Sequence, residues 1–144
     1  MRRFTQCVCI LLLAAVFFTV PVYAAENDMQ RASNYFGTNS QYLYQTSDTS
    51  FDICFDVTAV RRMEELGASK VVLQRSSDTI NWTDIKTYRK ADYPEMIDYD
   101  TVFHAGSFSY EGDEGYYYRA YVRYYAKDST GTEEFNTYST SVTL

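Results

Sequence analysis

The sequence predicts an all-β protein: a single antiparallel β-sandwich of about seven strands, with one short helical crossover over residues 59–67. Three observations lead to this fold class. Apolar and polar residues alternate over several short runs, as they do in half-buried strands. Clusters of turn-forming residues separate those runs. No linker or internal repeat divides the chain, so we expect one sandwich domain over residues 40–144.

Residues 1–24 have the pattern of a cleaved signal peptide. A positive start, Arg2 and Arg3, precedes the apolar run CVCILLLAAVFFTVPV, and small residues occupy the −3 and −1 positions before the bond that follows Ala24. The apolar stretch is shorter than the ~20 residues that span a bilayer, and Pro21 interrupts it. We expect cleavage after Ala24 and a secreted, extracellular product without a stable membrane anchor. An uncleaved transmembrane anchor is the alternative.

The elements of the first half follow in order. Residues 25–39 are polar and aperiodic, which predicts a loose N-terminal arm or an edge strand. The next run, SFDICFDVTAV, alternates with period two and predicts a half-buried strand. In AVRRMEELGAS the apolar residues Val60, Met63 and Leu66 recur at helical spacing, and Gly67 follows as a helix stop. These residues predict the helical crossover.

The second half predicts strands with turns between them. Two strands, KVVLQRS and WTDIKTY, are joined by the turn SDTIN. The acidic run DYPEMIDYDT contains proline and predicts a loop or an irregular edge strand. The strand FHAGSFSY and the turn EGDEG come next, followed by the longest strand, YYYRAYVRYYA. A hairpin turn, KDSTG, leads into a last strand that ends in TYSTSVTL.

The net charge of the protein limits the kinds of partner that it can bind. Signal cleavage leaves 11 bases against 19 acids, a net charge of −8. Affinity for nucleic acid comes largely from Lys and Arg contacts to phosphate, so we expect no nucleic acid partner and no anionic membrane surface.

The number of cysteines indicates whether disulfides stabilise the protein and where it is made. Cleavage leaves Cys54 alone, which excludes an intramolecular disulfide. We expect a buried, inert thiol, with an exposed thiol that links two copies as the alternative. So few cysteines in an exported chain favour a Gram-positive bacterium as the source.

The C-terminal third carries a resemblance to a known family. The run GYYYRAYVRYYAKDSTGTEEFNTYSTSVTL resembles the last two strands of a fibronectin type III-like, immunoglobulin-like domain. The resemblance implies that Tyr116 or Tyr118 is a corner tyrosine, whose hydroxyl bonds back to the backbone. The run MEELGASKVVLQRSSDTINWTDIKTY is similar to small exported domains of unknown function from Gram-positive, clostridial-type gut bacteria. That similarity implies a location and a fold but no activity.

The segment SSDTINW resembles the Asp-box hairpin, in which a Ser, an Asp two residues later and a closing Trp fasten a turn. Ser76, Asp78 and Trp82 match this motif, whereas Ile80 stands where the motif has Gly and the turn is one residue shorter. The resemblance implies a structural role, with Trp82 packed on its own hairpin. A platform on which a ligand stacks is the alternative.

No pattern predicts catalysis or zinc binding. His104 is the one histidine, and alternation predicts that it lies on a strand face; a catalytic base is the alternative. One His and one Cys fall short of a zinc site. An acidic cluster offers oxygen ligands for calcium, with solvated loop acids as the alternative. The cluster comprises Asp92, Glu95, Asp98 and Asp100.

The longest strand has two faces of different character. One parity predicts a core face: Tyr116, Tyr118, Ala120, Val122 and Tyr124. The other parity alternates aromatic rings and guanidinium groups: Tyr117, Arg119, Tyr121, Arg123 and Tyr125. Such a ladder can stabilise itself by cation–π contacts. It is also a candidate binding surface, because Tyr and Arg are enriched where proteins bind partners.

The sequence therefore predicts an exported, non-catalytic domain without a cofactor, unless calcium binds. Its expected role is a binding or adhesion module for an extracellular protein or glycan. A structural or accessory secreted protein with no dedicated ligand is the alternative. A hydrolase that uses loop carboxylates is a remote alternative.

Overall fold

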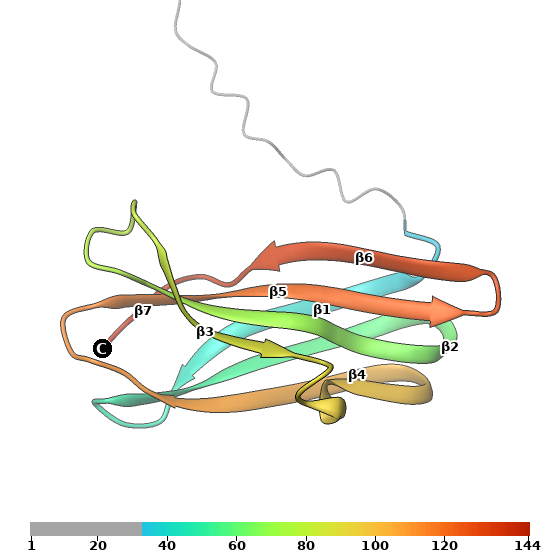
Figure 1. Ribbon diagram of the computed structural model, residues 1–144, viewed down its shortest axis with the longest axis horizontal. Helices are drawn as coiled ribbons and strands as arrows, with labels where there is room; N and C mark the ends of the chain where they lie inside the picture. The colour runs from blue at the N-terminus through green and yellow to red at the C-terminus, as the bar shows by residue number, and fades with distance from the viewer. Residues whose placement is uncertain (1–32) are drawn as a thin grey trace, which may run out of the picture. The chain divides into compact units, whose positions relative to one another are not determined.

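The computed structural model describes residues 33–144 of the 144-residue chain. The predicted signal peptide and most of the predicted N-terminal arm lie outside these residues. Within them the protein is all-β, with seven antiparallel strands in one strongly curled, half-barrel sheet (Figure 1). No helix in this part of the chain has the length and apolar character needed to cross a membrane.

The strand bounds are as follows: β1 (Phe36–Gln45), β2 (Ser50–Ser76), β3 (Thr83–Arg89), β4 (Ile97–Glu111), β5 (Tyr117–Asp128), β6 (Gly131–Tyr138) and β7 (Val142–Thr143). One 3-10 turn, η1 (Pro94–Met96), precedes β4. The prediction of an all-β fold with about seven antiparallel strands is confirmed. The first of these strands starts inside the segment that the sequence left as an arm or edge strand.

The 27-residue strand β2 organises the sheet, because its two halves have different neighbours. Residues 50–59 pair with β1 on one side and β4 on the other. Residues 65–76 pair with β5 on the side of β1, and residues 70–75 pair with β3 on the side of β4. The single sheet therefore curls about β2, and we call its two parts layers: β1, the first half of β2 and β4 form one, and β3, the second half of β2, β5, β6 and β7 form the other.

The predicted helical crossover over residues 59–67 is wrong, because these residues continue β2 as extended chain. Met63 and Leu66 are fully buried, whereas Val60 is 55% exposed. An irregularity in register lies between Thr58 and Met63, where β2 passes from one layer to the other. This bend brings residues at helical spacing onto the core without a helix. Residues 65–67 pair with β4 on one side and with β5 on the other, and the Val60 amide donates to the Tyr35 carbonyl oxygen at 2.9 Å.

Gly67 is a strand residue at the point where three strands meet, and it does not stop a helix. It pairs with Ile97 of β4 on one side and with Tyr125 of β5 on the other. A Cβ atom on this residue would lie 2.0 Å from the carbonyl oxygen of Met96. Glycine is therefore required for the close approach of the chain just before β4.

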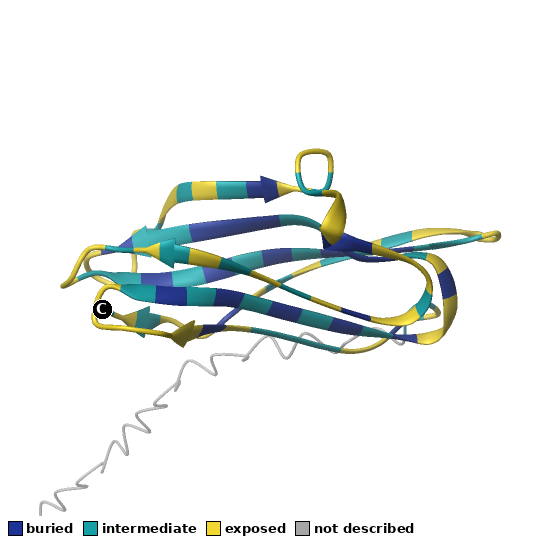
Figure 2. Ribbon diagram, turned by 90° about the horizontal axis from the view of Figure 1, so that it is seen from below, coloured by how far each residue is buried: buried dark blue, intermediate teal, exposed yellow. Residues whose placement is uncertain are grey.

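The core lies inside the curl and follows the predicted parity. Buried and half-buried residues alternate along β5 and along the first part of β2 (Figure 2). Of the side chains that sequence alternation assigned to the core, all except Tyr116 have at most 2% exposure: Phe51, Ile53, Phe55, Val57, Tyr118, Ala120, Val122 and Tyr124. Each large side chain of this kind contributes about 1.5–3 kcal/mol through burial. Tyr116 lies at the rim and is only half-buried.

Side chains bridge the open side of the curl between β1 and β6. The amide of Gln41 donates to the hydroxyl of Thr137 at 3.2 Å and to the carbonyl oxygen of Tyr138 at 3.1 Å. The hydroxyl of Tyr124 donates to the carbonyl oxygen of Ser40 at 2.6 Å. These contacts hold the two layers together where no ladder of backbone hydrogen bonds closes the sheet.

Candidate functional site

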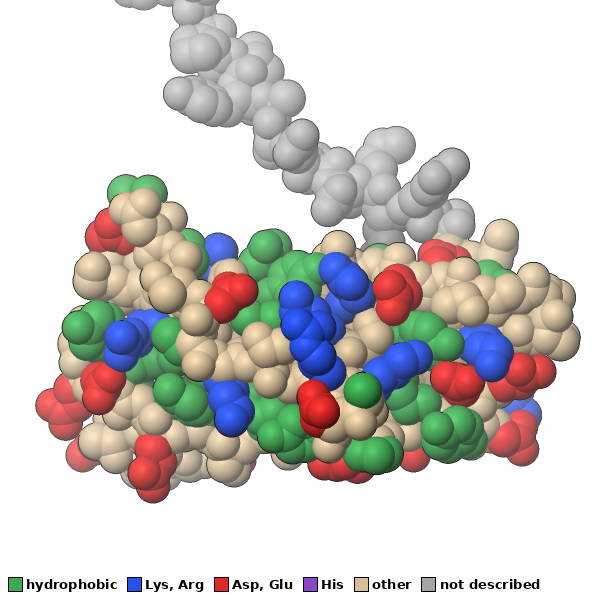
Figure 3. All heavy atoms as spheres, viewed as in Figure 1, with side chains coloured by type: hydrophobic (Ala, Val, Ile, Leu, Met, Phe, Trp, Pro, Cys, Tyr) green, Lys and Arg blue, Asp and Glu red, His purple; other side chains and the backbone are tan. Residues whose placement is uncertain are grey.

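The outer side of β3, β5, β6 and the second half of β2 gathers aromatic and basic side chains. Residues opposite each other in antiparallel strands project to the same side of a sheet. The register places Gln74 beside Arg119, Val72 beside Tyr121, and Tyr121 beside Tyr138. We call this surface the aromatic–basic face; Figure 3 looks onto it, with Lys and Arg in blue across its middle. It comprises Lys70, Val72, Gln74, Trp82, Asp84, Arg119, Tyr121, Arg123 and Tyr138.

The hairpin between β2 and β3 presents Trp82 to this face. The hydroxyl of Ser76 accepts from the amides of Asp78 and Thr79, at 3.1 and 2.9 Å. The Asp78 carboxylate accepts from the backbone amide of Asn81 at 2.8 Å, from its side chain at 2.7 Å, and from the Ile80 amide at 2.9 Å. These hydrogen bonds hold the pKa of Asp78 well below its usual range. The Trp82 indole N–H donates to the Thr79 carbonyl oxygen at 3.1 Å.

The ring of Trp82 also packs against the sheet, through Arg119. The guanidinium carbon of Arg119 lies 4.2 Å from the Trp82 ring and 4.5 Å from the centroid of Tyr138, so two aromatic rings flank one cation. Its Nε donates to Gln74 Oε1 at 2.8 Å, and Gln74 Nε2 donates to Asp84 Oδ1 at 2.7 Å. Trp82 is thus bonded to its own hairpin by its N–H and joined to the face by its ring.

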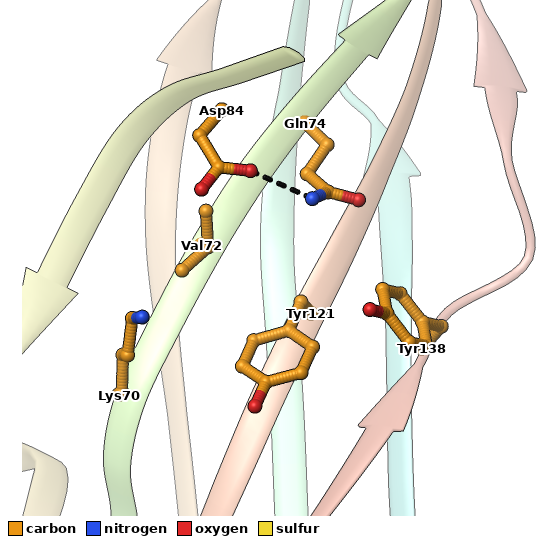
Figure 4. Close-up of a pocket in the computed structure, with 6 residues that line it drawn as sticks. All are labelled: Lys70, Val72, Gln74, Asp84, Tyr121 and Tyr138. Carbon is orange, nitrogen blue, oxygen red and sulfur yellow. Dashed lines mark hydrogen bonds between the residues drawn. The ribbon is translucent and has the colours of Figure 1, made fainter. Parts of the chain in front are cut away.

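A shallow hollow of about 260 Å³ lies next to this stack. Figure 4 shows the six side chains that line it: Lys70, Val72, Gln74, Asp84, Tyr121 and Tyr138. Tyr121 and Tyr138 meet edge to face with centroids 5.2 Å apart. Val72 is only 2% exposed, although it stands outside the core cluster. The aromatic and polar side chains of the face therefore cover an apolar residue beneath them.

The five predicted Tyr and Arg residues of β5 all lie on the outer side, but they do not stack on one another as a simple ladder. Arg119 stacks on rings from other strands. The Tyr121 hydroxyl accepts a hydrogen bond from Nη2 of Arg123 at 3.4 Å. The Tyr125 ring lies 3.4 Å from Nζ of Lys90. Tyr117 lies at the start of β5, opposite Ser76 and Thr143.

Five Lys and Arg side chains within residues 33–144 have no carboxylate oxygen at salt-bridge distance: Lys70, Lys86, Arg89, Arg119 and Arg123. All five lie on β2, β3 or β5, in the layer that carries the aromatic–basic face, and three belong to the face itself. Two acids lie near them: the Asp84 carboxylate is bonded to Gln74, and Glu134 lies opposite Tyr125. Tyr121 and, to a smaller extent, Glu134 raise the pKa of Arg123. The aromatic–basic face of an acidic protein therefore carries three cations without a salt-bridge partner among the described residues: Lys70, Arg119 and Arg123.

The predicted calcium ligands are not brought together. Asp98 lies 3.1 Å from a ring nitrogen of His104, and Asp100 lies 3.5 Å from Arg62. Glu95 belongs to η1, and Asp92 belongs to the turn before it. No group of three or more His, Cys, Asp or Glu side chains in residues 33–144 could hold a metal ion. Thermal melts with calcium and with a chelator remain the test of that prediction.

Tyr118 makes the contact that the family resemblance implies for a corner tyrosine. Its hydroxyl accepts from the backbone amide of Asp113 at 2.7 Å and donates to the carbonyl oxygen of the same residue at 3.1 Å. The side chain is fully buried. Tyr116, the other candidate, instead lies under the guanidinium group of Arg75 at 4.5 Å.

Cys54 lies on the outer side of the other layer, half-buried next to Tyr42. Burial raises the pKa of the Cys54 thiol, and the charge of the neighbouring Cys54 thiolate raises the pKa of Tyr42. The thiol is thus neither the enclosed side chain that we expected nor a freely exposed one. A raised pKa lowers the thiolate fraction and with it the reactivity.

We expect Trp82→Ala to lower the free energy of unfolding by about 1–2 kcal/mol, because it removes the cation–π contact with Arg119 and the indole hydrogen bond. Urea denaturation followed by circular dichroism measures the change. Ile80→Ala, at a 79% exposed position in the same turn, is the matched control and should leave stability unchanged. Unchanged stability of Trp82→Ala would show that the ring is free for a ligand and does not fasten the hairpin.

For His104 we expect a substitution to raise the free energy of unfolding. It is 3% exposed, and neither ring nitrogen has a hydrogen-bond partner in the described structure. The Asp98 carboxylate is near Nδ1 but is not aligned for a hydrogen bond. We expect His104→Leu to raise the free energy of unfolding at neutral pH by about 1 kcal/mol, because it removes buried polar atoms that lack partners. His104→Gln should give no such gain in the same urea titration. A loss of stability in His104→Leu would contradict this account.

Sequence reasoning located Tyr117 to Tyr125 on one face but missed the residues that complete it. Lys70, Gln74, Asp84 and Tyr138 come from other strands, so only the strand register brings them to Arg119 and Tyr121.

No protein-family model matches this chain, and no curated protein matches it in sequence.

Proposed function

We propose that this protein is an exported, non-catalytic binding module that engages another protein outside the cell through its aromatic–basic face. The observation that carries the proposal is the stack of Trp82, Arg119 and Tyr138 beside the hollow. Tryptophan, tyrosine and arginine are the residue types that dominate binding energy at protein interfaces. Secretion rests on the signal-peptide pattern of residues 1–24.

We also propose that the fold is a fibronectin type III-like sandwich. The strand pairings support this, with β1, β2 and β4 in one layer and β3, β2, β5 and β6 in the other. The Tyr118 hydroxyl bonded to the Asp113 backbone supports it as well. In such a sandwich the outer side of a layer is a rigid surface on which side chains keep fixed positions.

The aromatic–basic face is preorganised for a partner. Arg119 is flanked by two rings and bonded to Gln74, and Arg123 is bonded to Asn136 at 3.1 Å. Side chains that are already ordered lose little conformational entropy on binding. The cations of the face have no carboxylate partner, so they favour a partner with acidic side chains and accelerate its association.

A glycan is the second candidate, and the hollow favours it. A space of about 260 Å³ is small for a drug-sized ligand, and its lining combines Tyr121 and Tyr138 with the polar groups of Gln74 and Asp84. Aromatic rings pack on the C–H faces of sugars, while amide and carboxylate groups bind sugar hydroxyls. A structural protein without a ligand is the remaining alternative.

The test compares two double variants that change the same residue types. Tyr121→Ser with Arg123→Ser alters the face, whereas Tyr99→Ser with Arg62→Ser alters exposed residues at the start of β4 and at the bend of β2. Immobilised wild type and both variants are exposed to glycan arrays and to cell-wall and mucus extracts, and retained species are identified by mass spectrometry.

We expect the face variant to lose the retained partner by at least about tenfold, equivalent to about 1.4 kcal/mol, while the control retains it. Circular dichroism confirms that both variants are folded. Retention by none of the three proteins would favour the structural role, and equal retention by all three would exclude the aromatic–basic face as the binding surface.

A further inference from the structure

The outer side of β1, residues 50–58 of β2 and β4 carries acids and tyrosines but no cation. Tyr42 lies beside Cys54, and Tyr44 beside Asp52. Ser107 and Ser109 of β4 flank the same two β2 residues, and Asp56 follows next along β2. We call this surface the acidic–tyrosine face: Tyr42, Tyr44, Asp52, Cys54, Asp56, Ser107 and Ser109.

The charges of this face are not neutralised within the described part of the chain. The three strand segments that form it, residues 36–45, 50–58 and 97–111, contain no Lys or Arg. Asp52 accepts a hydrogen bond from Ser109 at 2.6 Å, and neither it nor Asp56 lies at salt-bridge distance from a cation. Tyr42 and Tyr44 project to solvent with 45% and 62% exposure.

The two faces of the protein are therefore complementary in charge. One presents Lys70, Arg119 and Arg123 without acidic partners, and the other presents Asp52 and Asp56 without basic partners. Both layers turn their inner sides toward one core cluster, so these outer sides point away from each other.

We propose that the partner of the aromatic–basic face is a second copy of this chain, docked through its acidic–tyrosine face. This inference rests on the proposed function, because it names the partner of the same surface. The exposed tyrosines act as anchors beside the hollow, and the aspartates meet the free cations.

The contact joins two different surfaces, so it is heterologous. Each copy that uses one face leaves the other face free, and association continues into short chains unless the rotation closes a ring. The net charge of −8 opposes association, which makes the contact weak and dependent on local charge pairs. Salt screens such pairs within a Debye length of about 8 Å at physiological ionic strength.

Sedimentation velocity on the purified protein measures this association. A reductant is present, so a disulfide between Cys54 residues does not contribute. We expect the weight-average sedimentation coefficient to rise with protein concentration at about 50 mM NaCl and to rise much less at about 500 mM NaCl.

Two charge-reversal variants, one for each face, are compared alone and as a mixture. One variant carries Asp52→Lys and Asp56→Lys; the other carries Lys70→Glu and Arg123→Glu. We expect each alone to associate at least about tenfold more weakly than wild type, because its altered face repels the unaltered face of a second copy. An equimolar mixture should regain association, because both altered faces and both unaltered faces are then complementary.

Two further variants keep this test interpretable. Lys70→Glu alone alters a side chain that makes no hydrogen bond in residues 33–144, which serves if the Arg123 change disturbs folding. Glu95→Lys with Glu114→Lys changes the net charge by the same amount as the aspartate pair, at exposed positions outside both faces. This control should associate as wild type does.

A wild type that stays monomeric at low salt overturns the inference, as does a mixture that fails to regain association while both variants are folded. If the protein stays monomeric but the face variant Tyr121→Ser with Arg123→Ser loses an extracellular protein or a glycan, the proposed function stands with a different partner. If neither self-association nor any retained partner is found, both proposals fail.

Discussion

Gly67→Ala is expected to lower the free energy of unfolding by about 3 kcal/mol, because a Cβ atom at this position would make the closest contact among the glycines of residues 33–144. The new Cβ would lie 2.0 Å from the Met96 carbonyl oxygen and 3.1 Å from the His104 ring. Both neighbours are enclosed, and Met96 is only 1% exposed. To relieve the contact, either β2 or the segment before β4 has to move, which disrupts pairing on both sides of Gly67.

Urea denaturation with a matched glycine control measures this effect. Gly37→Ala places its Cβ no closer than 3.4 Å to any atom, an ordinary contact, and should change the free energy of unfolding by less than about 1 kcal/mol. Equal stability of the two variants would mean that the bend of β2 adapts to a side chain. The requirement for glycine at the three-strand junction would then be wrong.

Truncation of Tyr118 should also cause a large loss in the free energy of unfolding. Tyr118→Ala should lower the free energy of unfolding by about 4 kcal/mol, because it leaves a cavity where a fully buried ring packs against Phe51 at 5.1 Å. Tyr118→Phe keeps the ring but leaves the Asp113 amide and carbonyl without their partner. We expect that change to cost about 1–2 kcal/mol.

The difference between the two Tyr118 variants separates packing from hydrogen bonding. Tyr44→Phe, at a 62% exposed position on β1, is the control and should leave stability unchanged. Thermal and urea denaturation by circular dichroism measure all three variants. If Tyr118→Phe is as stable as wild type, the hydroxyl contact does not anchor the turn before β5.

The strand parity was predictable because it depends on neighbouring residues alone. Alternation in residues 51–57 and 118–124 separates core from surface without knowledge of strand partners. The hairpin from Ser76 to Trp82 was predictable for the same reason, since its hydrogen bonds join residues at most three positions apart. Local chemistry determines such features.

The bend of β2 was not predictable from residues 59–67. Val60, Met63 and Leu66 have helical spacing, and an isolated chain would satisfy its backbone within a helix. In the fold, β4 and β5 pair with residues 63–67 from thirty or more residues away in sequence. Tertiary pairing overrides the local pattern here.

The candidate site also combines features that are predictable from the sequence with features that depend on long-range strand pairing. The sequence alone determined the all-β class, the core parity, the Trp82 hairpin and the outward position of Arg119, Tyr121 and Arg123, because each depends on local periodicity or short-range hydrogen bonds. Only the tertiary structure decided that Arg119 lies between Trp82 and Tyr138, and that the unpaired cations lie on the side opposite Asp52 and Asp56. Those arrangements depend on strand order and register, which are set by long-range pairing around one core.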